Sequence, residues 1–296
     1  MANIKGVLLV LVGAVCFSIK AILIKLAYGH SVDPVTLLTL RMVFSLPFFL
    51  AVPFFYLRKE TESKVTRHDL GYIVLLGVLG YYVASIFDFW GLAHVNAGLE
   101  RLILFVYPTI VVLLSAVFLK KPITKTIVFA LLLTYVGIFI IFSDVHLTKN
   151  ENVYLGASFI FVSALTYAAY LVGSGKLIPK LGSILFNAYA MIVACIAIMV
   201  HFAIFQPVDI FKLSNEIYLY GFALAIISTV IPTFLIAEGI NLIGASRASI
   251  VASVGPVITI FLGYFVLNEP ITILEVIGTA FVLGGVIFIS NEKVIR

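Results

Sequence analysis

Charged residues are scarce in this sequence of 296 residues. Asp, Glu, Lys and Arg together make up 11% of the chain, whereas a soluble domain carries about a quarter. Hydrophobic residues make up 62%, and the mean hydropathy is +1.19. This composition excludes an ordinary water-soluble domain and predicts an integral membrane protein.

The residue patterns of disulfide frameworks, metal sites and nucleotide hydrolysis are also missing. The two cysteines, Cys16 and Cys195, lie in apolar segments, and the five histidines lack the spacing of metal ligands. Residues 173–176 (GSGK) look like part of a phosphate-binding loop, but no upstream glycine has the required spacing and Leu177 replaces Ser or Thr. There is no G-x-S-x-G nucleophile motif either. We therefore expect no enzyme, no cofactor and no metal.

Long apolar runs fill most of the chain. A helix needs about 20 residues to cross the hydrocarbon core of a bilayer. Polar breaks divide the sequence into ten runs of about that length, at residues 4–28, 34–57, 70–92, 96–119, 123–142, 153–174, 182–205, 217–241, 245–268 and 271–291. The predicted fold is therefore all-α and integral to the membrane, with ten transmembrane helices.

Lysine and arginine are unevenly distributed among the predicted loops. If the N-terminus is cytoplasmic, thirteen of them fall on the cytoplasmic side and only Lys149 and Lys212 on the other. Cytoplasmic loops of membrane proteins carry such an excess, so both termini are predicted to be cytoplasmic. The same rule explains the basic composition without nucleic acid as a partner.

The two halves of the sequence resemble each other. Residues 91–124 align without a gap on residues 239–272, an offset of 148, and eight of the 34 positions are identical. Pro108 and Pro256 are among them, and proline inside an apolar helix is costly. We therefore expect two five-helix repeats, residues 1–148 and 149–296. Because five is odd, the second repeat begins on the opposite side of the membrane, and the repeats are inverted, as in many transporters.

The whole chain resembles the drug/metabolite transporter superfamily, and specifically its EamA-like family. The resemblance rests on GLAHVNAGLERLILFVYPTIVVLLSAVFLKKPIT and on its counterpart ending VGPVITIFLGYFVLNEPIT. The family pattern has an acidic residue before the next helix, which Glu269 matches, whereas Lys121 departs from it in the first half. Arg41 matches a basic position common in the family's first repeat. The resemblance implies ten helices in two inverted repeats, and transport of amino acids, other metabolites, nucleotide sugars or phosphorylated sugars.

Ionisable residues inside the predicted spans are costly and are therefore candidate functional residues. Six of them fall in the outer half of the membrane: Lys20, Lys25, Arg41, Asp88, Glu100 and Arg101. We predict an outer gate formed by Asp88, Glu100 and Arg101, and an inner gate formed by Glu238 and Arg247. The alternative, preferred for Lys25 and Arg247 near helix ends, is that the charges pair statically or extend to lipid headgroups.

Two pairs of equivalent helices are predicted to line a substrate path. The proline-containing helices 96–119 and 245–268 supply one pair, and the aromatic and polar stripes of helices 4–28 and 153–174 supply the other. The predicted path residues are Phe17, Lys20, Arg41, Tyr82, Asp88, Arg101, Tyr107, Pro108, Tyr167, Tyr170, Ser253 and Pro256. The alternatives are tight helix packing and, for Tyr81, Tyr82 and Trp90, an aromatic belt at the membrane interface.

Together these features predict a secondary carrier in the cell (inner or plasma) membrane. We expect it to export a small metabolite, such as an amino acid or a drug-like solute, by alternating access. The basic excess among the six outer charges favours a substrate with a carboxylate or phosphate. Protons could be coupled through Asp88, Glu100 or Glu238, although the sequence does not require it. The other expected partner is the lipid bilayer, and we expect the protein to be a monomer or a homodimer. The alternative function is that of a polytopic membrane enzyme or a channel.

Overall fold

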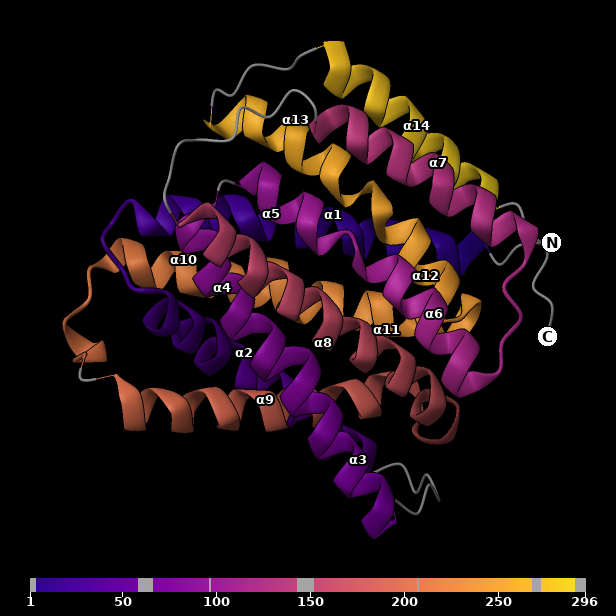
Figure 1. Cartoon of the computed structure of the whole chain (residues 1–296). Coiled ribbons are helices and arrows are strands. Elements are labelled where there is room, and N and C mark those ends of the chain that lie inside the picture. The colour runs from indigo at the N-terminus through magenta and orange to yellow at the C-terminus, as the bar shows by residue number, and fades with distance from the viewer. Residues whose placement is uncertain are drawn as a thin grey trace.

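The computed structural model describes residues 4–57, 66–95, 97–142, 152–206, 208–267 and 273–290. Over these ranges the chain is built from helices and short connections, without β-strands (Figure 1). Each of the ten segments predicted to be apolar helices contains helix.

The elements follow the chain in two similar series. The first half contains α1 (Ile4–Tyr28), α2 (Pro34–Leu57), α3 (Arg67–Gly77), η1 (Val78–Val83), α4 (Ala84–His94), α5 (Ala97–Leu104), α6 (Tyr107–Leu119) and α7 (Lys125–Phe142). The second half contains α8 (Val153–Leu181), α9 (Ser183–Phe205), η2 (Ile210–Lys212), α10 (Asn215–Ala225), η3 (Ile226–Val230), α11 (Ile231–Ile243), α12 (Ala245–Val251), η4 (Ala252–Val254), α13 (Gly255–Leu267) and α14 (Ile273–Ser290).

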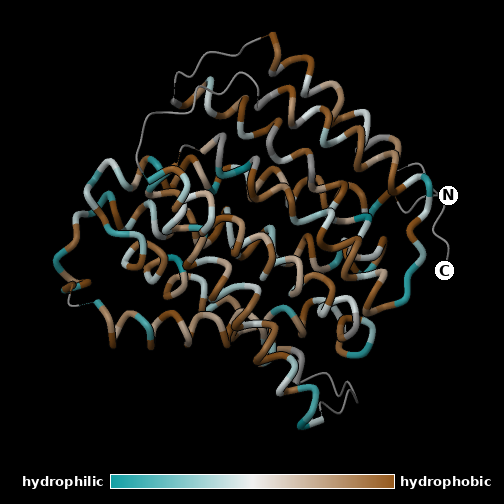
Figure 2. The backbone as a smooth tube through the Cα atoms, viewed as in Figure 1, coloured by the Kyte–Doolittle hydropathy of each residue, from teal (hydrophilic) through white to brown (hydrophobic). Residues whose placement is uncertain are grey.

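The surface of the helices is apolar, as a lipid environment requires. Among the described residues, six helical runs are long and apolar enough to cross a membrane: Ile4–Tyr28, Pro34–Phe55, Arg67–His94, Val153–Gly175, Ser183–Phe205 and Asn215–Ile243. Large side chains such as Phe118, Phe139 and Phe265 are 72%, 75% and 74% exposed, which is unfavourable in water. Hydrophobic segments run along the outer helices, and hydrophilic segments lie mainly at helix ends (Figure 2). The protein therefore spans the membrane several times.

Both halves contain a π-helical turn at the same place. η1 begins at Val78 and η3 at Ile226, which are 148 residues apart, and each continues directly into the next α-helix. They carry Tyr81 and Thr229, which are also 148 residues apart and are both buried. π-turns within α-helices are rare and are frequently found at functional sites.

The prolines that identified the repeat begin helices, although the sequence suggested kinks within them. α5 ends at Leu104 and α6 begins at Tyr107, so Pro108 lies in the first turn of a new helix. In the second half, the 3₁₀ turn η4 precedes α13, whose second residue is Pro256. The first turn of a helix tolerates proline because its N–H group has no partner within the helix. Each predicted helix, 96–119 and 245–268, is thus interrupted ahead of its proline.

The helix predicted to end at residue 174 continues to Leu181. A Cβ on Gly173 would overlap Leu76 of α3, so this glycine allows close helix packing and does not form a turn. The chain turns instead at Gly182, whose φ of +79° is in the region that favours glycine.

Glycines allow helices of the two halves to cross closely. α4 packs against α8, and α1 packs against α11. A Cβ on Gly91 would overlap Ile160, and a Cβ on Gly239 would overlap Val10. The two crossings are equivalent, because the glycines are 148 residues apart and the residues they meet are 150 apart. Small residues at such crossings are typical of helix packing in membranes.

The remaining helices form two outer pairs. α7 and α14 lie side by side along one face of the molecule, where a Cβ on Gly137 or Gly285 would overlap the facing helix (Figure 1). α2 packs against α9 at the opposite face (Figure 1). The crossing helices α1, α4, α8 and α11 lie between these pairs, and they enclose the site.

Candidate functional site

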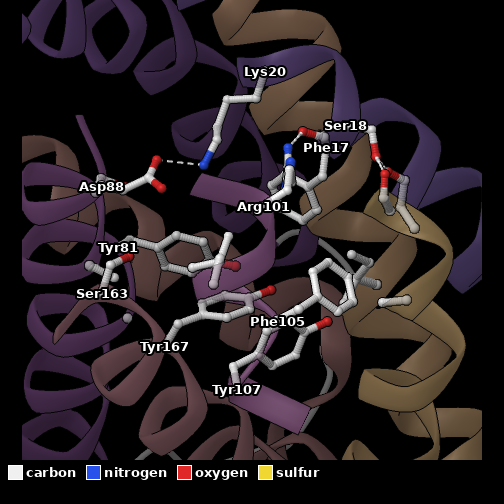
Figure 3. Close-up of a pocket in the computed structure, with 18 of the residues that line it drawn as sticks. Phe17, Ser18, Lys20, Tyr81, Asp88, Arg101, Phe105, Tyr107, Ser163 and Tyr167 are labelled. Carbon is white, nitrogen blue, oxygen red and sulfur yellow. Dashed lines mark hydrogen bonds and ion pairs between the residues drawn. The ribbon is translucent and has the colours of Figure 1, made fainter. Parts of the chain in front are cut away.

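A cavity of about 90 Å³ lies among helices contributed by both halves (Figure 3). A cavity of roughly 150 Å³ can hold benzene. The present conformation therefore accommodates several water molecules or one small chemical group. The residues that line the cavity are Ala14, Phe17, Ser18, Lys20, Arg41, Gly80, Tyr81, Ala84, Ser85, Asp88, Arg101, Leu104, Phe105, Tyr107, Ser163, Tyr167, Ile236, Ala252 and Gly255.

One end of the cavity is charged. The ammonium nitrogen of Lys20, on α1, lies 2.5 Å from Oδ2 of Asp88, on α4. The same nitrogen is 3.7 Å from Oε1 of Glu100, on α5. Asp88 is 3% exposed and Glu100 is fully buried. Lys20 is therefore shared by two carboxylates that come from different helices.

Arg101 forms the second cationic group at this end. Its Nε is 3.4 Å from Oε2 of Glu100, and its Nη2 donates a hydrogen bond to the backbone oxygen of Phe17. Neither oxygen of Glu100 makes a hydrogen bond with a described residue. The described contacts of Glu100 are its ion pairs with Lys20 and Arg101, and its carboxyl group also interacts with that of Asp88.

Arg41, on α2, is the third cation of the wall and is 3% exposed. Its Nε donates a hydrogen bond of 2.6 Å to Oγ1 of Thr229, in the π-turn η3 of the other half. Its guanidinium carbon lies 5.6 Å from the centre of the Phe89 ring, within the range of a cation–π contact. The π-turn of the second half thus orients a cation of the first.

The opposite end of the cavity is aromatic. In Figure 3, Tyr81, Phe105, Tyr107 and Tyr167 lie together, on the other side of the cavity from Lys20 and Asp88. The ring centres of Tyr107 and Tyr167 are 5.5 Å apart in an edge-to-face arrangement, and those of Phe105 and Tyr107 are 5.7 Å apart. Such rings offer apolar area together with hydroxyl groups. The cavity therefore combines a charged end with an amphipathic aromatic end.

A neutral hydrogen-bonded cluster lies beneath this aromatic end. The hydroxyl oxygens of Tyr81 and Tyr170 lie 3.1 and 3.0 Å from Oδ1 of Asn187, on α9. All three residues are buried. This contact crosses between halves, as the contact of Arg41 with Thr229 does.

The cavity brings together seven of the twelve predicted path residues: Phe17, Lys20, Arg41, Asp88, Arg101, Tyr107 and Tyr167. Tyr170 lies beneath the wall, against Tyr81, and Pro108 is buried at the start of α6. Tyr82 lies away from the cavity wall, with its hydroxyl 2.9 Å from Nδ1 of His201. The side chains of Ser253 and Pro256 lie outside the described part of the structure.

The predicted gate residues have different partners. Asp88 and Arg101 each pair with another residue of the charged end, as described above, and Lys25 donates a hydrogen bond to the backbone oxygen of Leu92. At the other end of the molecule, Glu238 accepts a hydrogen bond from Ser183, at the start of α9. The inner gate of Glu238 and Arg247 stays a prediction.

Sequence reasoning missed part of the wall. From the sequence, Tyr81 is identified only as a candidate for the interfacial aromatic belt and Ser85 is not singled out, although both residues line the cavity. A signal was present in the repeat, because Tyr81 aligns with Thr229 and Ser85 with Thr233 at the offset of 148. Positions that are polar in both copies of an apolar helix pair are therefore candidates for the wall.

Comparisons with known proteins identify the family of the chain. The EamA-like transporter family matches the chain twice, at residues 4–143 and 154–291. The uncharacterized transporter YcbK of Bacillus subtilis is 34% identical over 96% of this chain and 91% of its own length. An uncharacterized transporter of Archaeoglobus fulgidus is 26% identical over 84% and 88%, and the uncharacterized inner membrane transporter YicL of Salmonella typhimurium is 23% identical over 98% and 96%.

A solved crystal structure shares the fold. It is 16% identical and superposes with a TM-score of 0.77 over 96% of this chain and 95% of that one. The two family matches together cover nearly the whole sequence. This multi-span, all-helical membrane protein therefore belongs to the EamA-like transporter family.

Proposed function

We propose that the protein is a secondary carrier of the cell (inner or plasma) membrane, exporting a small metabolite or drug-like solute by alternating access. The supporting observation is the position of the cavity. Buried charged residues line it, and it lies where the crossing helices of the two halves meet. Carriers built from inverted repeats hold their substrate at such a junction and open it to one side at a time.

The proposal includes ten transmembrane helices in two inverted five-helix repeats, with both termini cytoplasmic. α1 begins and α14 ends at the same end of the molecule (Figure 1). The connection from α6 to α7, which carries Lys120 and Lys121, lies at that end, as does the end of α8, whose last turn contains Lys180 (Figure 1). Positive residues concentrated at one end support a cytoplasmic orientation for it.

The local backbone supports movement of one half against the other. The π-turns η1 and η3 and the interruptions before Pro108 and Pro256 occur at equivalent places around the cavity. Discontinuous helices at the repeat interface are typical of substrate sites in secondary transporters. Positions of this kind absorb backbone change while the glycine-packed crossings stay rigid.

Counterflow in proteoliposomes tests the proposal. Liposomes containing the purified protein are loaded with one unlabelled solute at millimolar concentration, and uptake of the same labelled solute from outside is followed. The solutes come from three panels: amino acids, nucleosides and organic anions. A carrier gives saturable uptake that is stimulated by the solute on the opposite side, whereas a channel gives uptake that is neither saturable nor stimulated. The absence of stimulated uptake with all panels would refute the proposal.

A further inference from the structure

The three cations of the cavity wall differ in their partners. Lys20 lies within 4 Å of two carboxylates, and Arg101 lies within 4 Å of one. Arg41 has no carboxylate within that distance among the described residues, although it is 3% exposed. An arginine cannot lose its charge as a lysine can, because its pKa is too high. Arg41 is therefore a buried cation without a carboxylate at ion-pair distance among the described residues, and Asp88 acts on it only from farther away.

The hydrogen bonds of Arg41 show which part of its side chain remains for a ligand. A guanidinium has five N–H donors in a planar fork. In the described structure one of them, on Nε, is used in the bond to Thr229. The terminal nitrogens are not among the buried polar atoms that lack partners, and Arg41 belongs to the cavity wall. It follows that the terminal N–H groups of the fork have access to the cavity.

The summed charge of the ionisable residues at the charged end also favours an anionic ligand. With every group ionised, three cations (Lys20, Arg41 and Arg101) face two carboxylates (Asp88 and Glu100), which leaves one positive charge in a buried space. A buried charge is unfavourable unless it is paired. A ligand with one negative charge would complete the pairing.

The aromatic end of the cavity defines the rest of the ligand. Tyr81, Phe105, Tyr107 and Tyr167 offer ring faces and edges rather than further charges. Ligand sites commonly combine an apolar wall with a few polar groups that fix orientation. An acidic group at Arg41 would place an attached apolar group toward these rings. The present cavity of about 90 Å³ holds the acidic group, and a ligand with a ring requires the cavity to widen as one half moves against the other.

We propose that Arg41 binds the acidic group of the substrate, and that the substrate class is a small organic carboxylate with an apolar or aromatic body. This inference rests on the proposed carrier function and deepens it. Thr229 acts as a positioning residue, because its hydroxyl holds Nε and leaves the bidentate edge of the guanidinium to the carboxylate. The substrate would then contact Arg41 of the first half, whose guanidinium is oriented by Thr229 in the π-turn η3 of the second half.

The first test measures binding to the purified, detergent-solubilised protein. Benzoate, benzamide and benzylamine share one ring and differ in charge, and inorganic phosphate supplies an anion without a ring. The apparent dissociation constant of each is obtained from the concentration dependence of the unfolding temperature. Benzoate is expected to stabilise the wild type, whereas benzamide and benzylamine are not. Stabilisation by benzylamine instead of benzoate, by phosphate instead of benzoate, or by none of the probes would overturn the inference.

Variants then assign the binding to Arg41. Arg41→Gln should weaken benzoate binding about 10- to 100-fold, the range of one charge-assisted bidentate contact. Arg41→Lys should be intermediate, because it keeps the charge but loses the fork. Lys212→Gln removes one positive charge from an exposed pair with Asp209 and is the matched control, with unchanged binding. Equal benzoate binding by Arg41→Gln and wild type would overturn the inference.

Stability without ligand separates a binding role from a structural one. Removal of a buried charge that has no carboxylate at ion-pair distance should leave the unfolding temperature of Arg41→Met equal to or above that of wild type. A marked decrease would show that Arg41 stabilises the fold and would contradict the proposal. Thr229→Val should weaken benzoate binding while Thr229→Ser restores it.

Counterflow distinguishes failure of this inference from failure of the carrier function. If the wild type exchanges solutes but Arg41→Gln keeps the same preference for anions, the carrier function stands and the role of Arg41 is wrong. If the wild type shows stimulated uptake of no solute while benzoate binding still depends on Arg41, the anion site stands and the carrier function is wrong.

Discussion

Lys20 and Asp88 form a buried ion pair, so replacing both residues should lower the unfolding free energy by less than the two single replacements do together. The test compares Lys20→Met, Asp88→Leu and the double variant, in which each replacement is apolar and similar in volume to the original side chain. Lys20→Met removes the ammonium that both Asp88 and Glu100 approach. Asp88→Leu leaves Lys20 with Glu100 at 3.7 Å. Lys20→Met should therefore lower the unfolding free energy more than Asp88→Leu does.

The distances set the magnitudes. At 2.5 Å, two unit charges attract by about 7 kcal/mol with an effective dielectric constant near 20. Burying two ions costs several kcal/mol for each, so the intact pair contributes little net stability. Lys20→Met leaves a carboxylate without its partner and should lower the unfolding free energy by about 3–5 kcal/mol. Asp88→Leu should cost about half as much, and the double variant should cost less than Lys20→Met alone.

Unfolding in mixed detergent micelles provides the assay. The single tryptophan, Trp90, lies on α4 two residues from Asp88, so its fluorescence reports locally while circular dichroism reports total helix. The coupling energy from the double-mutant cycle should be about 2–3 kcal/mol. Additive effects, or single variants that each change the unfolding free energy by less than about 1 kcal/mol, would refute the buried-pair description.

Three further predictions concern other parts of the molecule. Gly91→Ala places a Cβ against Ile160 and should lower the unfolding free energy by about 1–3 kcal/mol. Gly71→Ala is the control, because its Cβ would meet open space, and it should cause no such loss. Thermal unfolding of the two variants tests this difference. Lys180→Gln breaks the ion pair between the half-exposed Lys180 and Asp69, and it should change the unfolding free energy by less than about 1 kcal/mol because Lys180 remains in contact with solvent. A larger loss, measured by chemical unfolding, would contradict this prediction. Tyr82 lies outside the cavity wall, so Tyr82→Phe should leave the Michaelis constant for transport unchanged. A severalfold increase in that constant would place Tyr82 on the substrate path.

The repeat allowed much of the fold to be predicted from the sequence. An offset of 148 placed Pro108 over Pro256 and Gly91 over Gly239, and the structure uses both pairs at equivalent points. The position of the helix breaks was missed, because a proline pattern does not show whether proline kinks a helix or begins one. The length of α8 was missed for a related reason, since Gly173 serves packing rather than a turn.

The site was predicted less completely, because charge pairing depends on how helices cross. The sequence indicated that Lys20, Asp88 and Arg101 would gather at one level, and they line one cavity. Which acid pairs with which base depends on helix rotation and side-chain reach, and these follow from crossings that hydropathy does not specify. Tyr81 was missed because an aromatic residue in an apolar helix suits lipid, packing or a cavity wall equally well.

The difference between the halves gives the cavity its polarity. At the positions equivalent to Asp88 and Arg101, the second half has Ile236 and Ser249. The two similar halves of the sequence thus differ here, with charged residues in the first and neutral residues in the second. A cavity with unlike ends can orient its ligand.

Accessibility of the cavity from the two sides of the membrane tests the central claim most directly. Ser163→Cys, in a protein whose Cys16 and Cys195 are replaced by alanine, places one thiol in the cavity wall. The protein is reconstituted in vesicles, and a membrane-impermeant thiol reagent is added from either side. Alternating access predicts reaction from both sides, at rates that a counterflow substrate shifts in opposite directions. Reaction from one side only, or equal acceleration from both, would contradict it.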